Sequence, residues 1–103
     1  YIREFVAPRL VQGEPLLLMG DFNLTDQESA YRELVAGLQD AHAAAGVGMG
    51  NTWRPSRIMQ YGFALLRIDY LLSSPQLRPR ATTTDCTPRG GDHCIVQSVF
   101  ELQ

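Results

Sequence analysis

The first residues able to do chemistry are an acid and an amide, in the segment Gly20-Asp21-Phe22-Asn23. They follow a short apolar run, Leu16 to Met19, which predicts a strand covered on both faces. Side chains two apart on a strand point the same way, and ligand sites in α/β sheets favour the C-terminal ends of strands. The pattern therefore indicates a ligand-binding pair, Asp21 and Asn23, with one structural alternative: an Asx turn into the next helix.

Two further clusters carry charged side chains beside apolar segments. Arg67-Ile68-Asp69-Tyr70 places both charges inside a strand-like stretch, which indicates either a structural Arg67–Asp69 pair or a functional site. Gly90-Gly91-Asp92-His93 precedes the last apolar segment, and its glycines allow close approach to a ligand, although such loops are also common without one. Together, Asp69 and His93 suggest a carboxylate that orients an imidazole.

Hydrophobic periodicity predicts the elements that must position these clusters. Thr25 to Glu28 is a capping-box pattern, so a helix is expected to begin there and to continue through apolar positions to Leu38. The other expected elements are an amphipathic helix over 1–11, strands over 16–19, 63–73, 81–85 and 95–102, and a turn-rich connection over 43–50. His42, which follows the second helix among alanines, is expected to be exposed and inert.

Composition limits the class of protein. Of 103 residues, 45% are hydrophobic and 19% are charged, so we expect one small unit with a buried core. The net charge is −2 and every basic residue is arginine, which disfavours bulk electrostatic binding of nucleic acid and excludes lysine chemistry. Cys86 and Cys94 are too few for a disulfide scaffold and lack the paired spacing of a zinc site, so we expect reduced, buried thiols.

The start of the chain has neither a secretory signal pattern nor an initiator Met, and no apolar run approaches the ~20 residues of a membrane span. We therefore expect a piece of a longer protein. Its compartment stays open, because upstream sequence could carry a signal or an anchor.

Three motifs in order carry a family resemblance: GDFN after an apolar strand, RIDY within the next, and GGDH before the last, with Thr52-Trp53 between the first two. This arrangement resembles the endonuclease/exonuclease/phosphatase superfamily, and it extends over essentially the whole chain. One departure is Gly91, which stands where the family usually has a serine before Asp-His. The resemblance implies an α/β fold: residues 1–103 as one partial domain, the C-terminal half of a four-layer sandwich, with one mixed, mainly antiparallel sheet and helices on one face.

The resemblance also implies roles for the matching residues. Asp21 would position or deprotonate the attacking water, and Asn23 would hold a phosphate oxygen. Asp69 would orient His93, which would hydrogen-bond the phosphoryl oxygen and stabilise its developing charge. Asp92 would help to bind a divalent cation, Mg²⁺ or Mn²⁺, which prefers oxygen ligands.

Trp53 and Arg54 lie in the region that borders the substrate in this family, although Trp53 could equally be packing. The family's principal metal ligands, an asparagine and a glutamate, belong to the N-terminal half of the domain and have no counterpart here. We therefore expect a partner that covers the exposed sheet face, either the missing half or a second copy, and an isolated chain that self-associates.

The function implied is metal-dependent hydrolysis of phosphoesters by the longer protein. One alternative is a DNA endonuclease or exonuclease, with nucleic acid as a partner. The other is a non-catalytic half-domain or assembly module, because half of the metal shell is missing.

Overall fold

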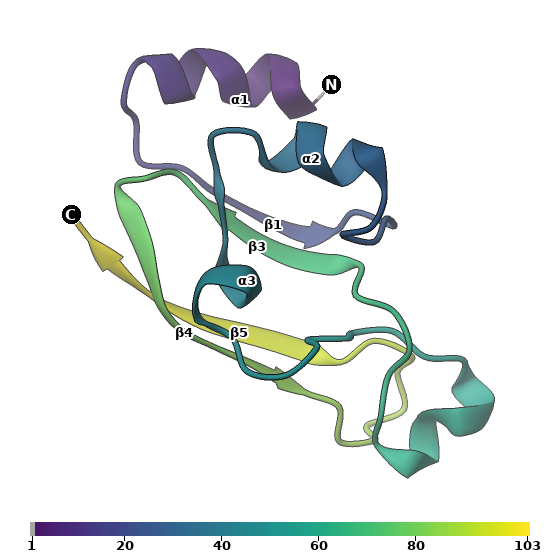
Figure 1. Ribbon diagram of the computed structural model, residues 1–103. Helices are drawn as coiled ribbons and strands as arrows, with labels where there is room; N and C mark the ends of the chain where they lie inside the picture. Colours follow the sequence, from purple (N-terminus) through teal and green to yellow (C-terminus); the bar gives the residue numbers. More distant parts are fainter. Residues whose placement is uncertain (1) are drawn as a thin grey trace.

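The chain is described by a computed structural model that covers residues 2–103. Its elements in chain order are α1 (Ile2–Val11), β1 (Leu17–Asp21), α2 (Ser29–Val35), β2 (Gln39–Asp40), α3 (Ala41–Ala45), the 3₁₀ helix η1 (Ser56–Tyr61), β3 (Asp69–Ser73), β4 (Leu77–Asp85) and β5 (Ile95–Leu102) (Figure 1). The α/β class is confirmed, and β5 has its predicted span. The first helix is also confirmed from Ile2; Tyr1 lies outside the described residues. No helix among residues 2–103 is long and apolar enough to cross a membrane.

All strand pairs are antiparallel, but the strands form two sheets where one was expected. One sheet has the order β1-β3-β2, and the other is the β4-β5 hairpin. Both edges of β3 are already occupied, because β2 pairs with Leu72 and Ser73 on the side away from β1. Nearer the start of β3, the Thr52 hydroxyl accepts hydrogen bonds from the backbone amides of Ile68 and Asp69. No edge of β3 is therefore left for β5.

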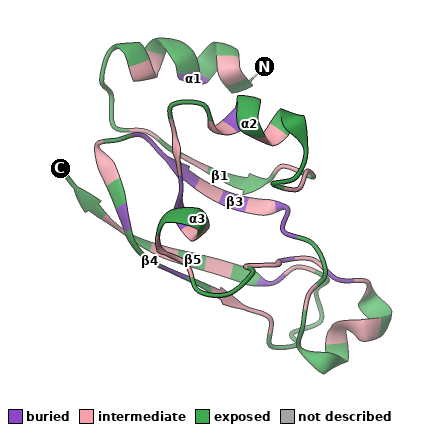
Figure 2. Cartoon of the chain, viewed as in Figure 1, coloured by how far each residue is buried: buried purple, intermediate pink, exposed green. Residues whose placement is uncertain are grey.

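The core lies between one face of the β1-β3-β2 sheet and helix α2. Helix α1 lies on the same side of this sheet (Figure 1). The centre of the core is formed by Leu34, Tyr70 and Leu72. Figure 2 shows buried segments on α2 and β3. The opposite face of β1 is open, since Met19 is 65% exposed and Leu17 is 41% exposed. The prediction of a strand covered on both faces is wrong for this chain, because its helices cover only one side.

Helix α2 begins at Ser29, later than the capping box predicted. Thr25 and Glu28 do form one capping-box contact, from the Thr25 backbone amide to the Glu28 carboxylate, but it closes a turn before the helix. Glu28 then becomes the residue that precedes the helix, without a side-chain cap. Helix α1 also differs from an amphipathic helix, because Val6 is its one buried residue among those described.

Other boundaries shifted for identifiable reasons. The strand predicted over 63–73 begins only at Asp69, and the residues before it make other contacts: Leu66 forms a bridge with Trp53, and the Arg67 side chain pairs with Asp40 of β2. The connection over 43–50 is helical as far as Ala45. The predicted strand over 81–85 is extended back to Leu77 by pairing with the end of β5.

The best-buried ion pair joins Arg67 to Asp40, not to Asp69. The two Arg67 terminal nitrogens donate to the two Asp40 oxygens at 3.0 and 2.7 Å, and Tyr31 donates to the same carboxylate at 2.6 Å. Burial alone would raise the pKa of Asp40, but hydrogen bonds from Arg67 and Tyr31 outweigh it and hold the pKa below 3.8. The structural Arg67–Asp69 pair considered from the sequence is therefore wrong.

We expect Asp40→Asn to destabilise the chain by about 3 kcal/mol at pH 7, because it leaves a buried guanidinium without its counter-charge. Asparagine keeps the oxygen that accepts from the first amides of α3, so the change tests the charge. Urea unfolding measures it. The exposed Arg80–Glu101 pair supplies the control, and Glu101→Gln should cost less than about 1 kcal/mol.

The same pair predicts a pH dependence. Because the folded pKa of Asp40 is depressed, its contribution is present above pH 3.8 and is lost as pH falls through the folded pKa. The stability difference between the native chain and Asp40→Asn should shrink in that acid range. A difference that stays constant with pH would contradict the assignment.

Candidate active site

Strands β1 and β3 place two carboxylates directly opposite each other. Asp21 is the last residue of β1, and its register partner is Asp69, the first residue of β3. Like charges in this relation destabilise a sheet unless something compensates them. Here the side chain of His93, from the loop before β5, lies between the two acids.

The two nitrogens of the His93 ring face different acids. Nδ1 lies 2.7 Å from Asp69 Oδ2, and Nε2 lies 3.6 Å from Asp21 Oδ2. The hydrogen bond with Asp69 raises the pKa of His93 above 6.5, and the charges of the neighbouring acids outweigh the opposing effect of partial burial. With Nδ1 held by Asp69, Nε2 is left to act on a bound group. The structure thus brings Asp69, His93 and Asp21 together, while their catalytic roles stay predictions.

A pocket of about 310 Å³ opens over this cluster. Its polar lining comes from Asp21, Asn23, Thr25, Glu28 and His93, with Trp53 and Leu66 among its apolar walls. Asn23 is not on the strand. Its φ is +53°, in the left-handed region that asparagine tolerates, and its backbone amide donates to Asp21 Oδ1 at 2.8 Å. The Asx turn is therefore formed, and both residues nevertheless line the pocket.

Asp92 and Trp53 are linked to each other beside the cluster. The Trp53 indole N–H donates to Asp92 Oδ2 at 3.2 Å, and Asp92 Oδ1 lies 3.9 Å from His93 Nε2. Trp53 lines the pocket, and its contact with substrate stays a prediction. The prediction for Arg54 is wrong: its side chain is 1% exposed, and it points to Cys94 and Gly91 instead of the pocket.

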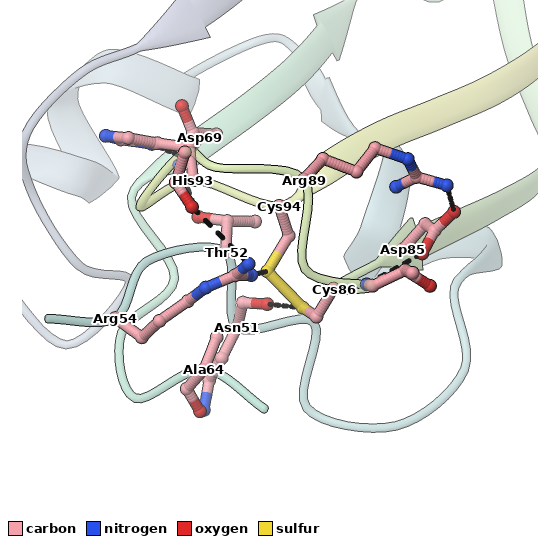
Figure 3. The surroundings of a disulfide bond; sticks show 12 residues. Asn51, Thr52, Arg54, Ala64, Asp69, Asp85, Cys86, Arg89, His93 and Cys94 are labelled. Atoms are coloured by element: carbon pink, nitrogen blue, oxygen red, sulfur yellow. Dashed lines mark hydrogen bonds and ion pairs between the residues drawn. A yellow bond between two sulfur atoms is a disulfide. The ribbon is translucent and has the colours of Figure 1, made fainter. Parts of the chain in front are cut away.

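The expectation of reduced thiols is also wrong, because Cys86 and Cys94 form a disulfide (Figure 3). The end of β4 and the residue before β5 are neighbours in the hairpin, which brings the two Cα atoms to 4.5 Å. His42 differs from expectation as well. It is half-buried, and its Nε2 lies 2.9 Å from the Gly48 carbonyl oxygen.

The donor set fits a hard divalent cation in part. Asp21, Asp69 and His93 each offer one possible ligand atom, and these three atoms lie within 4.8 Å of one another. Mg²⁺ and Mn²⁺ favour oxygen ligands, which the carboxylates of Asp21 and Asp92 offer on the side of His93 Nε2. These residues can supply some positions of an octahedral shell, and further oxygen ligands are needed to complete it.

Two residues that matter for this geometry are not predicted by the sequence. Thr52 is 1% exposed and joins β3 to the His93 loop through Ile68, Asp69 and Cys94. Asp40 is the buried partner of Arg67. A threonine offers no local signal of such a role, whereas an acid just before an alanine-rich helix could have been read as a helix cap.

Comparisons with known proteins agree with this geometry. The sequence model described as the Endonuclease/Exonuclease/phosphatase family matches residues 1–93. The chain therefore belongs to the endonuclease/exonuclease/phosphatase family. A comparison with curated proteins found no match.

Solved structures show the same fold. A functionally unknown conserved protein from Enterococcus faecalis V583 is 22% identical with a TM-score of 0.76, over 99% of this chain and 42% of its own. The mannosyl-6-phosphatase Bt3783 of Bacteroides thetaiotaomicron VPI-5482 is 19% identical with a TM-score of 0.76, over 97% of this chain and 42% of its own. A family protein from Bacteroides thetaiotaomicron is 20% identical with a TM-score of 0.71, over 92% and 41%. The chain thus spans well under half the length of these proteins.

Replacing Asp69 by Asn should lower the pKa of His93 toward 6.5, because the strongest interaction that favours the imidazolium is removed. An NMR titration of the His93 ring in the metal-free chain measures this. Since the folded pKa is raised, the pairing stabilises the fold fully below pH 6.5, and this contribution is lost as pH rises through the folded pKa.

The control for this titration is Glu101→Gln, which changes an acid in the β4-β5 hairpin that pairs with Arg80. It should leave the His93 curve in place. An Asp69→Asn chain in which His93 titrates as before would show that Asp69 does not hold the ring.

Proposed function

We propose that this chain is the C-terminal half of a divalent-metal-dependent phosphoesterase, which hydrolyses its substrate by attack of water on phosphorus. The observation that carries the proposal is that His93 lies between two acids directly opposed across β1 and β3, Asp21 and Asp69, and that Asp21 and His93 line one pocket. Opposed carboxylates destabilise a sheet, and a site that binds a divalent cation supplies a functional reason for them.

The proposed roles follow from where each side chain lies. Asp21 is half exposed at the pocket, where its carboxylate can orient a water and accept its proton. His93 is held through Nδ1 by Asp69, and its raised pKa favours the protonated ring. Its Nε2–H can donate to a phosphoryl oxygen and stabilise the charge that develops there. Asn23 contributes an amide that can hydrogen-bond a second oxygen.

Mg²⁺ or Mn²⁺ would be held on the Asp21 and Asp92 side of His93, together with ligands from outside this chain. When bound, such a cation neutralises charge on the phosphoryl group and lowers the pKa of water. Asp92 is already oriented by the indole of Trp53 at 3.2 Å, so its second oxygen is directed toward the His93 side. This arrangement agrees with the proposed metal role of Asp92.

The substrate is proposed at the level of a phosphoester. The mannosyl-6-phosphatase among the similar structures supports phosphoester cleavage on this fold. Trp53 and Leu66 give the pocket an apolar wall against which the leaving group can pack. The net charge of −2 favours a small substrate over the long polyanion of duplex DNA.

The partner we propose for the open face of β1 is the remainder of a longer protein. Met19 and Leu17 are exposed there, and the similar structures are more than twice as long as this chain. The same remainder would supply the missing metal ligands. In the isolated chain a second copy is expected to cover this face, because bare apolar surface favours association.

The test is hydrolysis of p-nitrophenyl phosphate and bis-p-nitrophenyl phosphate by the longer protein that contains this segment, with Mn²⁺ or with EDTA. We expect metal-dependent turnover of at least one ester, reduced by about a hundredfold or more in Asp21→Ala and in His93→Ala. Glu101→Gln, remote from the pocket, should retain full activity. Turnover that survives EDTA, or that survives both site variants, would contradict the proposal.

A further inference from the structure

The Cys86–Cys94 disulfide encloses the loop that carries Asp92 and His93 (Figure 3). It joins the residue after β4 to the residue before β5, with a sequence separation of 8. Cys94 is the immediate neighbour of His93, so this covalent link limits how far the ring of His93 can move. The positions of both Asp92 and His93 therefore depend on whether the link is closed.

The two sulfurs have different surroundings. Cys94 is buried at 7% exposure, whereas Cys86 is only half-buried. The Arg54 guanidinium lies against the buried sulfur, with Nη1 2.6 Å from Cys94 Sγ (Figure 3). Attack by an external thiolate is therefore sterically easier at Cys86, and Cys94 is the sulfur that has a cation beside it.

Arg54 is a buried cation without an acidic partner among residues 2–103. Its side chain is 1% exposed, its Nε has no hydrogen-bond partner, and its Nη2 has only a distant contact with the Gly91 carbonyl at 3.5 Å. A buried charge that lacks compensation costs free energy. Negative charge on Cys94 would supply that compensation, and cleavage of the disulfide is the event that creates it.

We infer that Cys86–Cys94 is a reducible disulfide, and that Arg54 favours its cleavage by stabilising the sulfur that leaves. A dithiol is the reductant. One of its sulfurs, as thiolate, attacks Cys86 Sγ; the Sγ–Sγ bond breaks, and its electron pair leaves on Cys94 Sγ beside Arg54. The second dithiol sulfur then attacks the mixed disulfide and releases Cys86.

The exchange transfers two electrons from the dithiol to the Cys86–Cys94 disulfide. The dithiol is oxidised to a disulfide and gives up two protons. Cys86 and Cys94 are both reduced. One proton binds to the Cys86 thiolate and the other is released to solvent. Cys94 remains a thiolate beside the Arg54 guanidinium. No further reactant is needed.

Reduction would remove the covalent link that closes the loop between Cys86 and Cys94, and noncovalent contacts alone would then hold Asp92 and His93. Those that remain include the Cys94 amide bonded to the Thr52 carbonyl and the hydrogen bond between His93 and Asp69. The effect on catalysis rests on the proposed function: the reduced form should position Asp92 and His93 less well. The readouts below need no turnover, so the proposed function can fail without affecting them.

The first experiment equilibrates the chain with mixtures of reduced and oxidised dithiothreitol at pH 7, alkylates free thiols and counts them by mass spectrometry. Arg54→Met should shift the equilibrium about tenfold toward the disulfide, because the charge on Cys94 is no longer compensated. Arg89→Met is the matched control, since Arg89 is exposed on the same loop and pairs with Asp85. An Arg54→Met equilibrium equal to that of the native chain would overturn the role of Arg54.

A second measurement uses the unaltered chain, in case Arg54→Met fails to fold. Brief exposure to glutathione, followed by acid quenching and peptide mapping, should place the mixed disulfide on Cys86. A mixed disulfide on Cys94 would overturn the proposed direction of cleavage.

The third measurement tests the restraint on the loop. In the Cys86→Ser, Cys94→Ser chain, trypsin should cleave after Arg89 about tenfold faster than in the oxidised native chain, relative to cleavage after Arg32 in α2. Equal relative rates would show that the disulfide does not restrain the loop, and would overturn the inference of a redox-dependent site.

Discussion

The geometry of the site depends on one buried residue, Thr52. Its hydroxyl oxygen accepts from the backbone amides of Ile68 and Asp69, both at 3.2 Å, and its carbonyl accepts from the amide of Cys94 at 2.6 Å. Its own amide donates to Leu66. Loss of the hydroxyl would leave buried donors unsatisfied, which costs about 1–3 kcal/mol for each group. Thr52 therefore fixes the start of β3 relative to the loop of His93, and this relation brings Asp69 to the ring.

Different residues make the buried ion pair of the fold and the candidate site. The buried carboxylate of Asp40 accepts hydrogen bonds from Arg67 and Tyr31, and these three residues lie outside the pocket. Beside the pocket, Asp21 and Asp69 are opposed in register, and the ring of His93, which is accessible to solvent, lies between them. Opposed like charges that reduce stability are expected at a site where the fold supports a functional group.

The sequence predicted what depends on local pattern. The pairing of Asp69 with His93 could be predicted, because an acid in a strand and a histidine in a later loop suggest a carboxylate that orients an imidazole. The place of Asp21 beside them followed from the family resemblance and not from local pattern. The span of β5 follows from a plain apolar segment. Contacts between distant segments were not predictable in this way. Arg67 pairs with Asp40 and Arg54 with Cys94, over 27 and 40 residues, and no local periodicity encodes such partners. The division into two sheets has the same origin, because it depends on which strands reach the edges of β3.

The most direct measurement of whether this chain carries half of a metal-dependent site is paramagnetic broadening by Mn²⁺ in the ¹⁵N-labelled, disulfide-bonded chain. Substoichiometric Mn²⁺ should broaden the amide signals of Asp21, Asp92 and His93 first, and Asp21→Asn should weaken that broadening strongly. Asp85 and Glu101, exposed acids outside the pocket, serve as internal controls. Broadening at His93 no stronger than at Asp85 and Glu101, or broadening unchanged by Asp21→Asn, would contradict a metal site at this cluster.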